Sequence, residues 1–466
     1  MAFGFFRKKE SADIIYMNGH IYTQDLEYPW ATAVACKDKE VMAVGDFEAM
    51  EDITDENTEV VDLQNRYLFP GFIDVHSAPV LQAFEGTYMK INNEWDVEPI
   101  LDILADYVDE CEYPVIFGYG FHERILERFD SADAAHRALD EIERYKPILL
   151  LGESGHHCWV NSAASALIRA AAEEEEEDFI TTNFILNALS PLPLEELESL
   201  WKKHSEEMAD KGFTSLFNLC TPDCFTDVYL DNMLSAIGEG EGDILQRFHG
   251  SIYVNRPFHP QMILRRLSAA RTSCIELDGL ITADFAKFDV CKDSGEAEFS
   301  QEALDTICLE LAEHGYGIHM DAKDQESFAK AEQTFSLLRE KGYRNIPLIL
   351  ASRYEPTSDF EDAYLKTWPT DIWENSFFDQ VESVEEAIYA MTAGAAEMLG
   401  KSKIIGSIEK GKRADFVVFD ENPMASSLER FATMHADMTI LDGQVVYDAD
   451  EAAADEMCDL LFSMQL

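Results

Sequence analysis

Residues Leu68–Val80 read LFPGFIDVHSAPV, a short apolar segment that ends at a histidine. Phe72-Ile73-Asp74-Val75 follows the turn residues Pro70-Gly71 and predicts a short buried strand, because strands covered on both faces are nearly continuous apolar runs. His76 lies at the carboxyl end of this strand. In parallel barrels the carboxyl ends of the strands carry the chemistry, so His76 is a candidate functional residue.

Composition limits the classes of partner. The chain has 466 residues, of which 47% are hydrophobic, enough for a large domain with an accessory domain or for two to three ordinary domains. Lys and Arg total 36 and Asp and Glu total 90, so the formal charge is 36 − 90 = −54. This charge opposes binding to nucleic acids and to anionic membranes, and we expect neither as a partner.

The cysteines and the N-terminal residues indicate the cellular compartment of the protein. The nine cysteines are scattered and odd in number, which indicates reduced thiols rather than a disulfide framework. The opening MAFGFFRKKES places its apolar patch before its charges, the reverse of a signal peptide. We therefore expect a cytoplasmic protein.

The two ends of the chain carry turn-separated strand patterns. Residues 12–67 contain short alternating segments around the hairpin signal Asn18-Gly19, and residues 406–447 end in a second hairpin at Asp442-Gly443. The prediction is a discontinuous β-sandwich domain from residues 1–71 and 405–448. Residues 449–466 are predicted to form an acidic C-terminal helix that docks on the body.

Strands and helices alternate between these ends, which is typical of an α/β fold with a TIM-like (β/α) barrel over residues 72–404. The predicted barrel strands after the first include 114–120, 147–151, 213–219, 281–290, 317–320 and 346–351. Residues 352–383 show no good apolar strand. The barrel is therefore expected to be shortened near strands 7 and 8, unless a poorly patterned strand lies in 367–378.

Three segments resemble one known family. PGFIDVH at 70–76 resembles the PGFIDxHxH strand of the amidohydrolase superfamily. GHHCWVNS at 155–162 resembles the DGHxxWVNS segment of its N-substituted formamide deformylase-like branch, with Ser154 in place of the Asp. Residues 406–418 resemble the GSLxPGKxADLVV segment that closes the β-sandwich of composite amidohydrolases. The resemblance implies a metal-dependent hydrolase of carbon–nitrogen bonds other than peptide bonds. A small amide-like molecule is the implied substrate or ligand.

The metal ligands implied by this resemblance are only partly present. His76 is kept, whereas Ala78 replaces the second histidine of the first strand. Lys287 matches the lysine of strand four, which is carboxylated in the family, and His319 matches the histidine of strand five. The strand-six histidine and the strand-eight aspartate have no counterpart.

Nearby carboxylates could complete such a site. Asp74 lies two residues before His76 and is expected on the same strand face, so it is a candidate ligand. Asp321, two residues after His319, is the candidate catalytic carboxylate. The resemblance also implies that His156, Trp159 and Asn161 contribute to the substrate pocket.

Three hypotheses follow. The leading one is an amidohydrolase-fold protein whose metal site is degraded and inactive but still binds a small molecule. A second is an active enzyme with a remodelled single-metal site, which holds zinc or another divalent cation through His76, His319 and a carboxylate, since three protein ligands and a water suffice for catalytic zinc. The third is a non-catalytic acidic scaffold or regulatory protein. The sequence leaves a homo-oligomer open.

Overall fold

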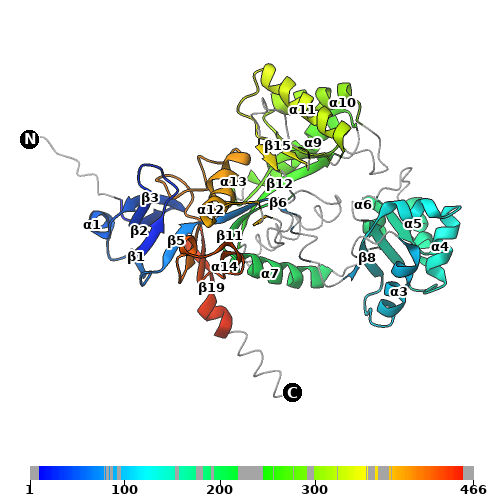
Figure 1. Ribbon diagram of the computed structural model, residues 1–466, viewed down its shortest axis with the longest axis horizontal. Coiled ribbons are helices and arrows are strands. Elements are labelled where there is room, and N and C mark those ends of the chain that lie inside the picture. The colour runs from blue at the N-terminus through cyan, green and yellow to red at the C-terminus, as the bar shows by residue number, and fades with distance from the viewer. Residues whose placement is uncertain are drawn as a thin grey trace, which may run out of the picture.

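The computed structural model describes most of the chain, and its parts follow one another along the long axis of the molecule (Figure 1). Described are residues 10–77, 79, 83, 88–91, 96–152, 157–174, 182–189, 194–218, 245–254, 257–275, 278–290, 299–322, 324–352, 354, 363–365, 377–378 and 380–454. Strands from both chain ends form one end of the molecule, a parallel sheet lies in the middle, and a smaller lobe that contains β8 lies at the other end.

The two ends of the chain form one eight-stranded sheet, in the order β19-β18-β17-β5-β1-β2-β3, with β4 also paired to β1. Its strands are β1 (Ile14–Tyr22), β2 (Trp30–Lys37), β3 (Glu40–Gly45), β4 (Glu59–Asp62), β5 (Tyr67–Pro70), β17 (Phe416–Phe419), β18 (Met438–Leu441) and β19 (Gln444–Asp448). β5 pairs antiparallel with β17, with Phe69 opposite Val417. Strands near the two ends of the chain therefore share a sheet, while the sandwich form and the proposed domain limits stay predictions.

The central sheet has seven strands in the order β16-β15-β14-β13-β12-β11-β6, and all its pairs are parallel. These strands are β6 (Phe72–Ser77), β11 (Phe213–Asn218), β12 (Arg247–Val254), β13 (Ile281–Asp289), β14 (Gly317–Asp321), β15 (Leu348–Ala351) and β16 (Ala363–Leu365). Helices α9 (Pro260–Ser273), α10 (Gln301–Glu313) and α11 (Gln325–Glu340) connect successive strands from β12 to β15, as expected for a (β/α) unit.

This sheet is strongly curled. His76 on β6 and His319 on β14 are in contact, with 3.2 Å between His76 Nδ1 and His319 Nε2, although β11, β12 and β13 lie between their strands. In a flat sheet four strand spacings would separate them by about 19 Å. The sheet therefore wraps around its own interior, as a barrel wall does.

The strand predictions need two corrections. β8 (Ile116–Phe121) and β9 (Ile148–Gly152), expected in the barrel, form instead a separate four-stranded sheet with β7 (Met89–Lys90) and β10 (Cys158–Val160). An apolar run reports burial on both faces, but it does not tell which sheet a strand joins. In the segment 352–383 no good apolar strand was found and a poorly patterned one was left open at 367–378, whereas the structure has the three-residue strand β16 just before that range.

Helices complete the smaller lobe and connect it to the central sheet. The lobe contains α3 (Val97–Val108), α4 (Ala132–Asp140), α5 (Ser162–Glu174) and α6 (Thr182–Leu189). The long helix α7 (Leu194–Asp210) runs from this lobe toward β11 (Figure 1). Trp201 on α7 packs against the apolar clusters of both parts, so α7 connects them.

Two short helices lie against the first strand of the central sheet. α12 (Val384–Met391) and α13 (Ala393–Met398) precede the return of the chain to the sheet formed by its ends. Ala395 and Ala396 of α13 pack with Ile73 and Val75 of β6 in one buried cluster. This packing fixes the strand that carries His76.

A buried ion pair joins the sheet of the chain ends to the base of β12. Arg247 donates from Nε to Asp415 Oδ2 at 2.7 Å and from Nη2 to Asp415 Oδ1 at 3.0 Å, and it also pairs with Asp442. The backbone amide of Gly71, just before β6, donates to the carbonyl of Asp415 at 2.9 Å. The two sheets are therefore held together directly below the strand that carries His76.

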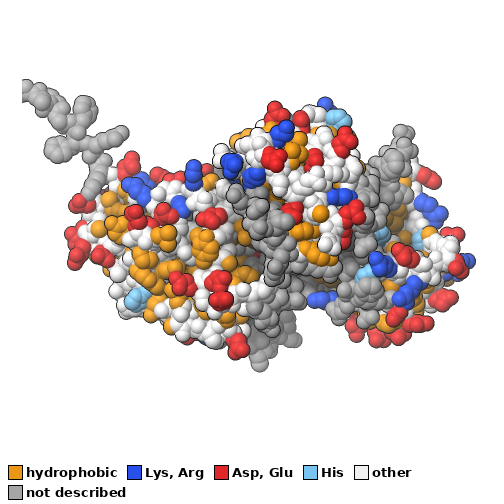
Figure 2. Space-filling view, turned by 45° about the horizontal axis from the view of Figure 1, so that its top comes forward, with side chains coloured by type: hydrophobic (Ala, Val, Ile, Leu, Met, Phe, Trp, Pro, Cys, Tyr) orange, Lys and Arg blue, Asp and Glu red, His pale blue; other side chains and the backbone are white. Residues whose placement is uncertain are grey.

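The described surface is rich in acidic side chains, and the C-terminal residues begin a helix. Figure 2 shows Asp and Glu side chains across the visible described surface, in agreement with the excess of acidic residues. Residues 449–454 are helical, and the remainder of the predicted C-terminal helix lies outside the described residues. Among the described helices, none has the length and apolar character needed to cross a membrane.

Candidate metal centre

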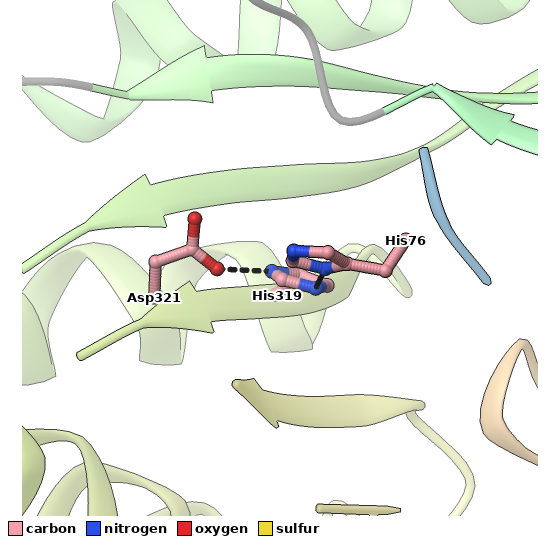
Figure 3. Close-up of side chains that lie close together, drawn as sticks. All are labelled: His76, His319 and Asp321. Atoms are coloured by element: carbon pink, nitrogen blue, oxygen red, sulfur yellow. Dashed lines mark hydrogen bonds and ion pairs between the residues drawn. The ribbon is translucent and has the colours of Figure 1, made fainter. Parts of the chain in front are cut away.

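Two histidines from distant strands meet inside the curled sheet. The rings of His76 and His319 have centroids 5.1 Å apart and planes inclined by 27°, and His76 Nδ1 faces His319 Nε2 (Figure 3). Both side chains are buried, with His319 fully inaccessible. The separation of 3.2 Å between these two nitrogens is a hydrogen-bond distance.

Asp321 provides a carboxylate on the other side of His319. Its Oδ1 lies 3.4 Å from His319 Nδ1, so the three side chains form a continuous row (Figure 3). Asp321 follows His319 by two residues on β14, so both side chains face the same side of the sheet. One ligand atom from each of His76, His319 and Asp321 can be chosen so that all lie within 4.8 Å of one another.

Burial determines the protonation state of His319. Loss of solvent around the ring lowers its pKa from 6.5 to about 4, against the smaller opposing effect of Asp321; Lys287 lowers the pKa further. His319 is therefore a neutral imidazole at neutral pH. A neutral imidazole keeps the nitrogen lone pair that a metal ion needs.

The donor set fits a divalent cation. Buried His319 Nδ1 makes no hydrogen bond among the described residues, although Asp321 lies at ion-pair distance. Two imidazoles and one carboxylate are a common protein ligand set for catalytic zinc. His76, His319 and Asp321 are therefore able to hold one such ion.

Lys287 lies beside this row but contacts only its carboxylate in the described structure. Its Nζ is 2.7 Å from Asp321 Oδ2, and it lies over the ring of Tyr253 at 5.0 Å from the centroid. Lys287 is the neighbour of His319 in the β13–β14 register. The strand-four lysine thus reaches the site, and its role as a ligand stays a prediction.

Asp74 supports His76 through the backbone. Its Oδ1 accepts a hydrogen bond from the His76 amide at 2.9 Å, and the Asp74 side chain is buried. Asp74 is not part of the three-residue group found among the described residues. A role for Asp74 as a ligand therefore remains untested, whereas its contact with the His76 backbone is present.

Aromatic side chains that the sequence did not single out line the site. Phe217 on β11 stacks on His319 with centroids 5.8 Å apart and planes inclined by 23°. Tyr253 on β12 lies under the Lys287 ammonium. On β15, Ile349 and Ala351 are the neighbours of His319 and Asp321 in register, which matches the absence of a histidine at strand six. The only sequence signal for Phe217 was its place on the predicted strand 213–219, and no strand was predicted at Tyr253.

The residues predicted to line the substrate pocket are in the smaller lobe or outside the described part. His156 lies outside the described residues. Trp159 is buried in the lobe, and its Nε1 donates to the carbonyl of Ala135 at 2.8 Å. These contacts explain Trp159 as a residue of the lobe's core, and substrate binding by it stays an untested prediction.

Asn161 supports the backbone of the same lobe. Its Nδ2 donates to the carbonyls of Glu143 and Lys146 at 2.9 and 2.8 Å, and its Oδ1 accepts from the amides of Ile148 and Ala164 at 3.1 and 2.9 Å. The side-chain amide therefore has partners for both its donor and its acceptor atoms. Substrate binding by Asn161 is likewise untested.

Comparison with known proteins agrees with the fold. A model of the amidohydrolase family matches residues 59–345 and 356–447. The structure is similar to an uncharacterized metal-dependent hydrolase from Pyrococcus horikoshii OT3, with a TM-score of 0.61, 16% identity, and coverage of 89% of this chain and 99% of that one. It also resembles an adenosine deaminase from Xanthomonas campestris with bound zinc, with a TM-score of 0.50, 13% identity, and coverage of 96% and 97%.

The curated relatives match shorter parts of this chain than the solved structures do. The exoenzymes regulatory protein AepA of Pectobacterium carotovorum is 27% identical over 164 residues, which is 34% of this chain and 35% of that protein. The imidazolonepropionase of Alkaliphilus oremlandii is 26% identical over 241 residues, 49% of this chain and 52% of that protein. The chain thus spans about a third to a half of these relatives.

Proposed function

The chain belongs to the amidohydrolase family, and from this premise we propose that it is a metal-dependent hydrolase of non-peptide carbon–nitrogen bonds in small molecules. The observation that supports this proposal is the convergence of His76, His319 and Asp321, whose ligand atoms lie within 4.8 Å of one another. This is the remodelled single-metal hypothesis, in which Asp321 makes up for the ligands missing at strands one and six.

The proposed chemistry is assigned to these side chains. His76 and His319 hold zinc or another divalent cation as neutral imidazoles, with Asp321 as the carboxylate of the site. A divalent cation here supplies Lewis-acid polarisation of a carbonyl and makes water more acidic. The Asp321 carboxylate, through the oxygen that does not bind the ion, accepts the proton that water loses as its oxygen attacks the amide carbon, and the leaving nitrogen takes up a proton as the carbon–nitrogen bond breaks.

The relatives suggest a substrate class to test first. The name of the Alkaliphilus relative refers to an imidazolone, a cyclic amide. We therefore propose a small cyclic or N-substituted amide as the substrate. Cytoplasmic location, pocket roles for His156, Trp159 and Asn161, and a homo-oligomer remain predictions.

A second function has a specific observation in its favour. His76 and His319 are at hydrogen-bond distance from each other, and Asp321 forms an ion pair with Lys287. The polar groups can therefore partner one another without a cation, as a degraded, ligand-binding site would require.

A hydrolysis assay distinguishes the active metal-dependent hydrolase from the degraded, ligand-binding protein. Protein stripped with a chelator and reloaded with Zn²⁺ is assayed on lactams, hydantoins, imidazolones and N-formyl amines, with His319→Ala as the test variant. His314→Ala, which removes an exposed histidine at the C-terminal end of α10, is the matched control. We expect turnover by the reloaded wild type and by His314→Ala, and a loss of at least about 100-fold in His319→Ala. Turnover that persists in stripped protein or in His319→Ala would refute the proposal.

A further inference from the structure

Three buried polar atoms on β11 and β12 have no hydrogen-bond partner among the described residues. They are Ser215 Oγ, Arg247 Nη1 and His249 Nε2, and each belongs to a residue that is at most 3% exposed. Buried polar atoms in folded proteins are almost always paired, either with protein groups or with ordered water. These three atoms therefore indicate a small bound molecule as their common partner.

The register of the two strands places these side chains on one face of the sheet. Ser215 lies opposite Arg247, and Phe217 lies opposite His249, without a register shift between them. Opposite residues, and residues two apart on a strand, point to the same side of a sheet. Phe217 stacks on His319, which lies inside the curled sheet, so this side is the interior.

The spacing of the strands suits one small bridging molecule. Neighbouring strands are about 4.8 Å apart, and residues two apart on a strand are separated by about 6.6 Å. A molecule that makes two hydrogen bonds of about 2.8 Å spans a similar distance. The guanidinium of Arg247 is anchored to Asp415 through Nε and Nη2, which leaves Nη1 for such a contact.

The neighbours of His249 determine which ring nitrogen carries the proton. Burial, together with Lys401 and Arg247, lowers the pKa of His249 to about 3, so the ring is neutral at neutral pH. Its Nδ1 lies 3.5 Å from Thr282 Oγ1, and the Thr282 hydroxyl is hydrogen-bonded to the Asp284 carboxylate. A carboxylate only accepts, so the single hydroxyl proton is used there and His249 Nδ1 is the donor to Thr282. His249 Nε2 therefore has a lone pair and needs a donor.

The three atoms make different demands on a bound molecule. Arg247 Nη1 only donates, His249 Nε2 only accepts, and Ser215 Oγ does either. A halide ion accepts from Arg247 but has no proton to donate to His249. A metal cation could bind His249 Nε2, but the guanidinium would repel it and would stay without an acceptor. Water has two donor and two acceptor positions and meets all three demands.

We propose that Ser215, Arg247 and His249 form an internal water site on the interior face of the curled sheet. The water accepts from Arg247 Nη1, donates to His249 Nε2 and bonds to Ser215 Oγ, and three such bonds are typical of a buried water. It links the salt bridge between the two sheets to the barrel wall. The inference is independent of the proposed metal and of hydrolysis.

High-resolution crystals of the full-length wild-type protein test the site, with a second set soaked in sodium bromide. We expect an ordered water within hydrogen-bond distance of both Arg247 Nη1 and His249 Nε2, and no anomalous bromide signal there. Direct contact of Nη1 with Nε2, or the absence of a water that bridges them, would overturn the proposal. A bromide ion in its place would assign the site to an anion and would also overturn it.

Ring ¹⁵N NMR of histidine-labelled protein tests the donor assignment independently. His249, identified by the signal missing in His249→Phe, should have Nε2 unprotonated. A protonated Nε2 would contradict the proposal, because the water could not donate to it. Crystals of His249→Phe, which keeps a ring without nitrogens, should lose the water, whereas His314→Phe at an exposed position should retain it. A water that remains in His249→Phe would show that His249 is not its partner.

Discussion

Arg247 on β12 and Asp415, just before β17, form a bidentate salt bridge in the interior. Both oxygens of Asp415 accept hydrogen bonds from the guanidinium, at 2.7 and 3.0 Å. Both side chains are almost completely buried. The pair lies between the sheet built by the chain ends and the parallel sheet that carries the candidate site.

Loss of this pair should destabilise the whole protein. Arg247→Met leaves the buried carboxylate of Asp415 without its cation, and removal of one partner of a buried pair costs about 3–5 kcal/mol. Chemical denaturation measures the change in free energy of unfolding. Arg430→Met breaks an exposed pair with Glu421 and should cost less than about 1 kcal/mol. Equal effects of the two variants would contradict this assignment.

Acid sensitivity should depend on His249. Burial lowers the pKa of His249 from 6.5 to about 3, helped by the nearby positive charges of Lys401 and Arg247. Between these two pH values the unfolded chain binds a proton that the folded protein excludes. The contribution of His249 to stability is therefore complete above pH 6.5 and declines as the pH falls toward 3.

Thermal unfolding across that range measures the effect. The wild-type melting temperature should fall as the pH drops from 6.5 to 4, and the fall should be smaller in His249→Gln, which has no titrating ring. His314→Gln, at an exposed position, should keep the wild-type slope. A parallel slope in His249→Gln would show that another group controls the acid response.

Gly212, in the turn between α7 and β11, should not tolerate a side chain. Its φ is +85°, and an added Cβ would lie 2.5 Å from Val417 Cγ2. Gly212→Ala should therefore cost both backbone strain and a steric clash, in total more than about 2 kcal/mol. Gly315→Ala is the matched control, because its φ is +74° and its Cβ would meet nothing within 4 Å. If the two variants have the same free energy of unfolding, the clash with Val417 is not real.

Asp74 should influence metal binding through the backbone of His76. Asp74→Ala removes the acceptor for the His76 amide and should weaken Zn²⁺ binding about 10-fold, the lower end of the range for outer partners of metal ligands. Asp74→Asn keeps an acceptor oxygen and should stay within about threefold of the wild type. Titration against a chromogenic chelator measures both. A large loss in Asp74→Asn would instead assign the effect to the negative charge, as expected of a ligand.

The sequence predicted the parts of the site that depend on local pattern. His76 was found because it ends a short apolar strand, and His319 because it matches the strand-five histidine of the family that the sequence resembles; a (β/α) order brings such strand ends to one edge. The expected fold class agrees with a curled parallel sheet and a second, largely antiparallel sheet from the chain ends. These features need only the periodicity of a few residues.

Other features depend on contacts that no local pattern records. The strands at 116–121 and 148–152 are as apolar as barrel strands, yet they pair with each other in a separate sheet. Arg247 is charged and lies in a segment without a recognisable motif, so its burial against Asp415 could not be anticipated. The carboxylate of Asp321 was a candidate, but its contact with Lys287 depends on the register of β13 and β14.

The central claim is that His76, His319 and Asp321 hold one divalent cation, and equilibrium dialysis of the chelator-stripped, full-length protein against Zn²⁺ tests it most directly. We predict about one equivalent of zinc per chain in the wild type and in His314→Ala, and a loss of this binding in His76→Ala and in His319→Ala. A folded wild-type protein that retains no zinc, or a His319→Ala variant that binds it as tightly as the wild type, would contradict the account.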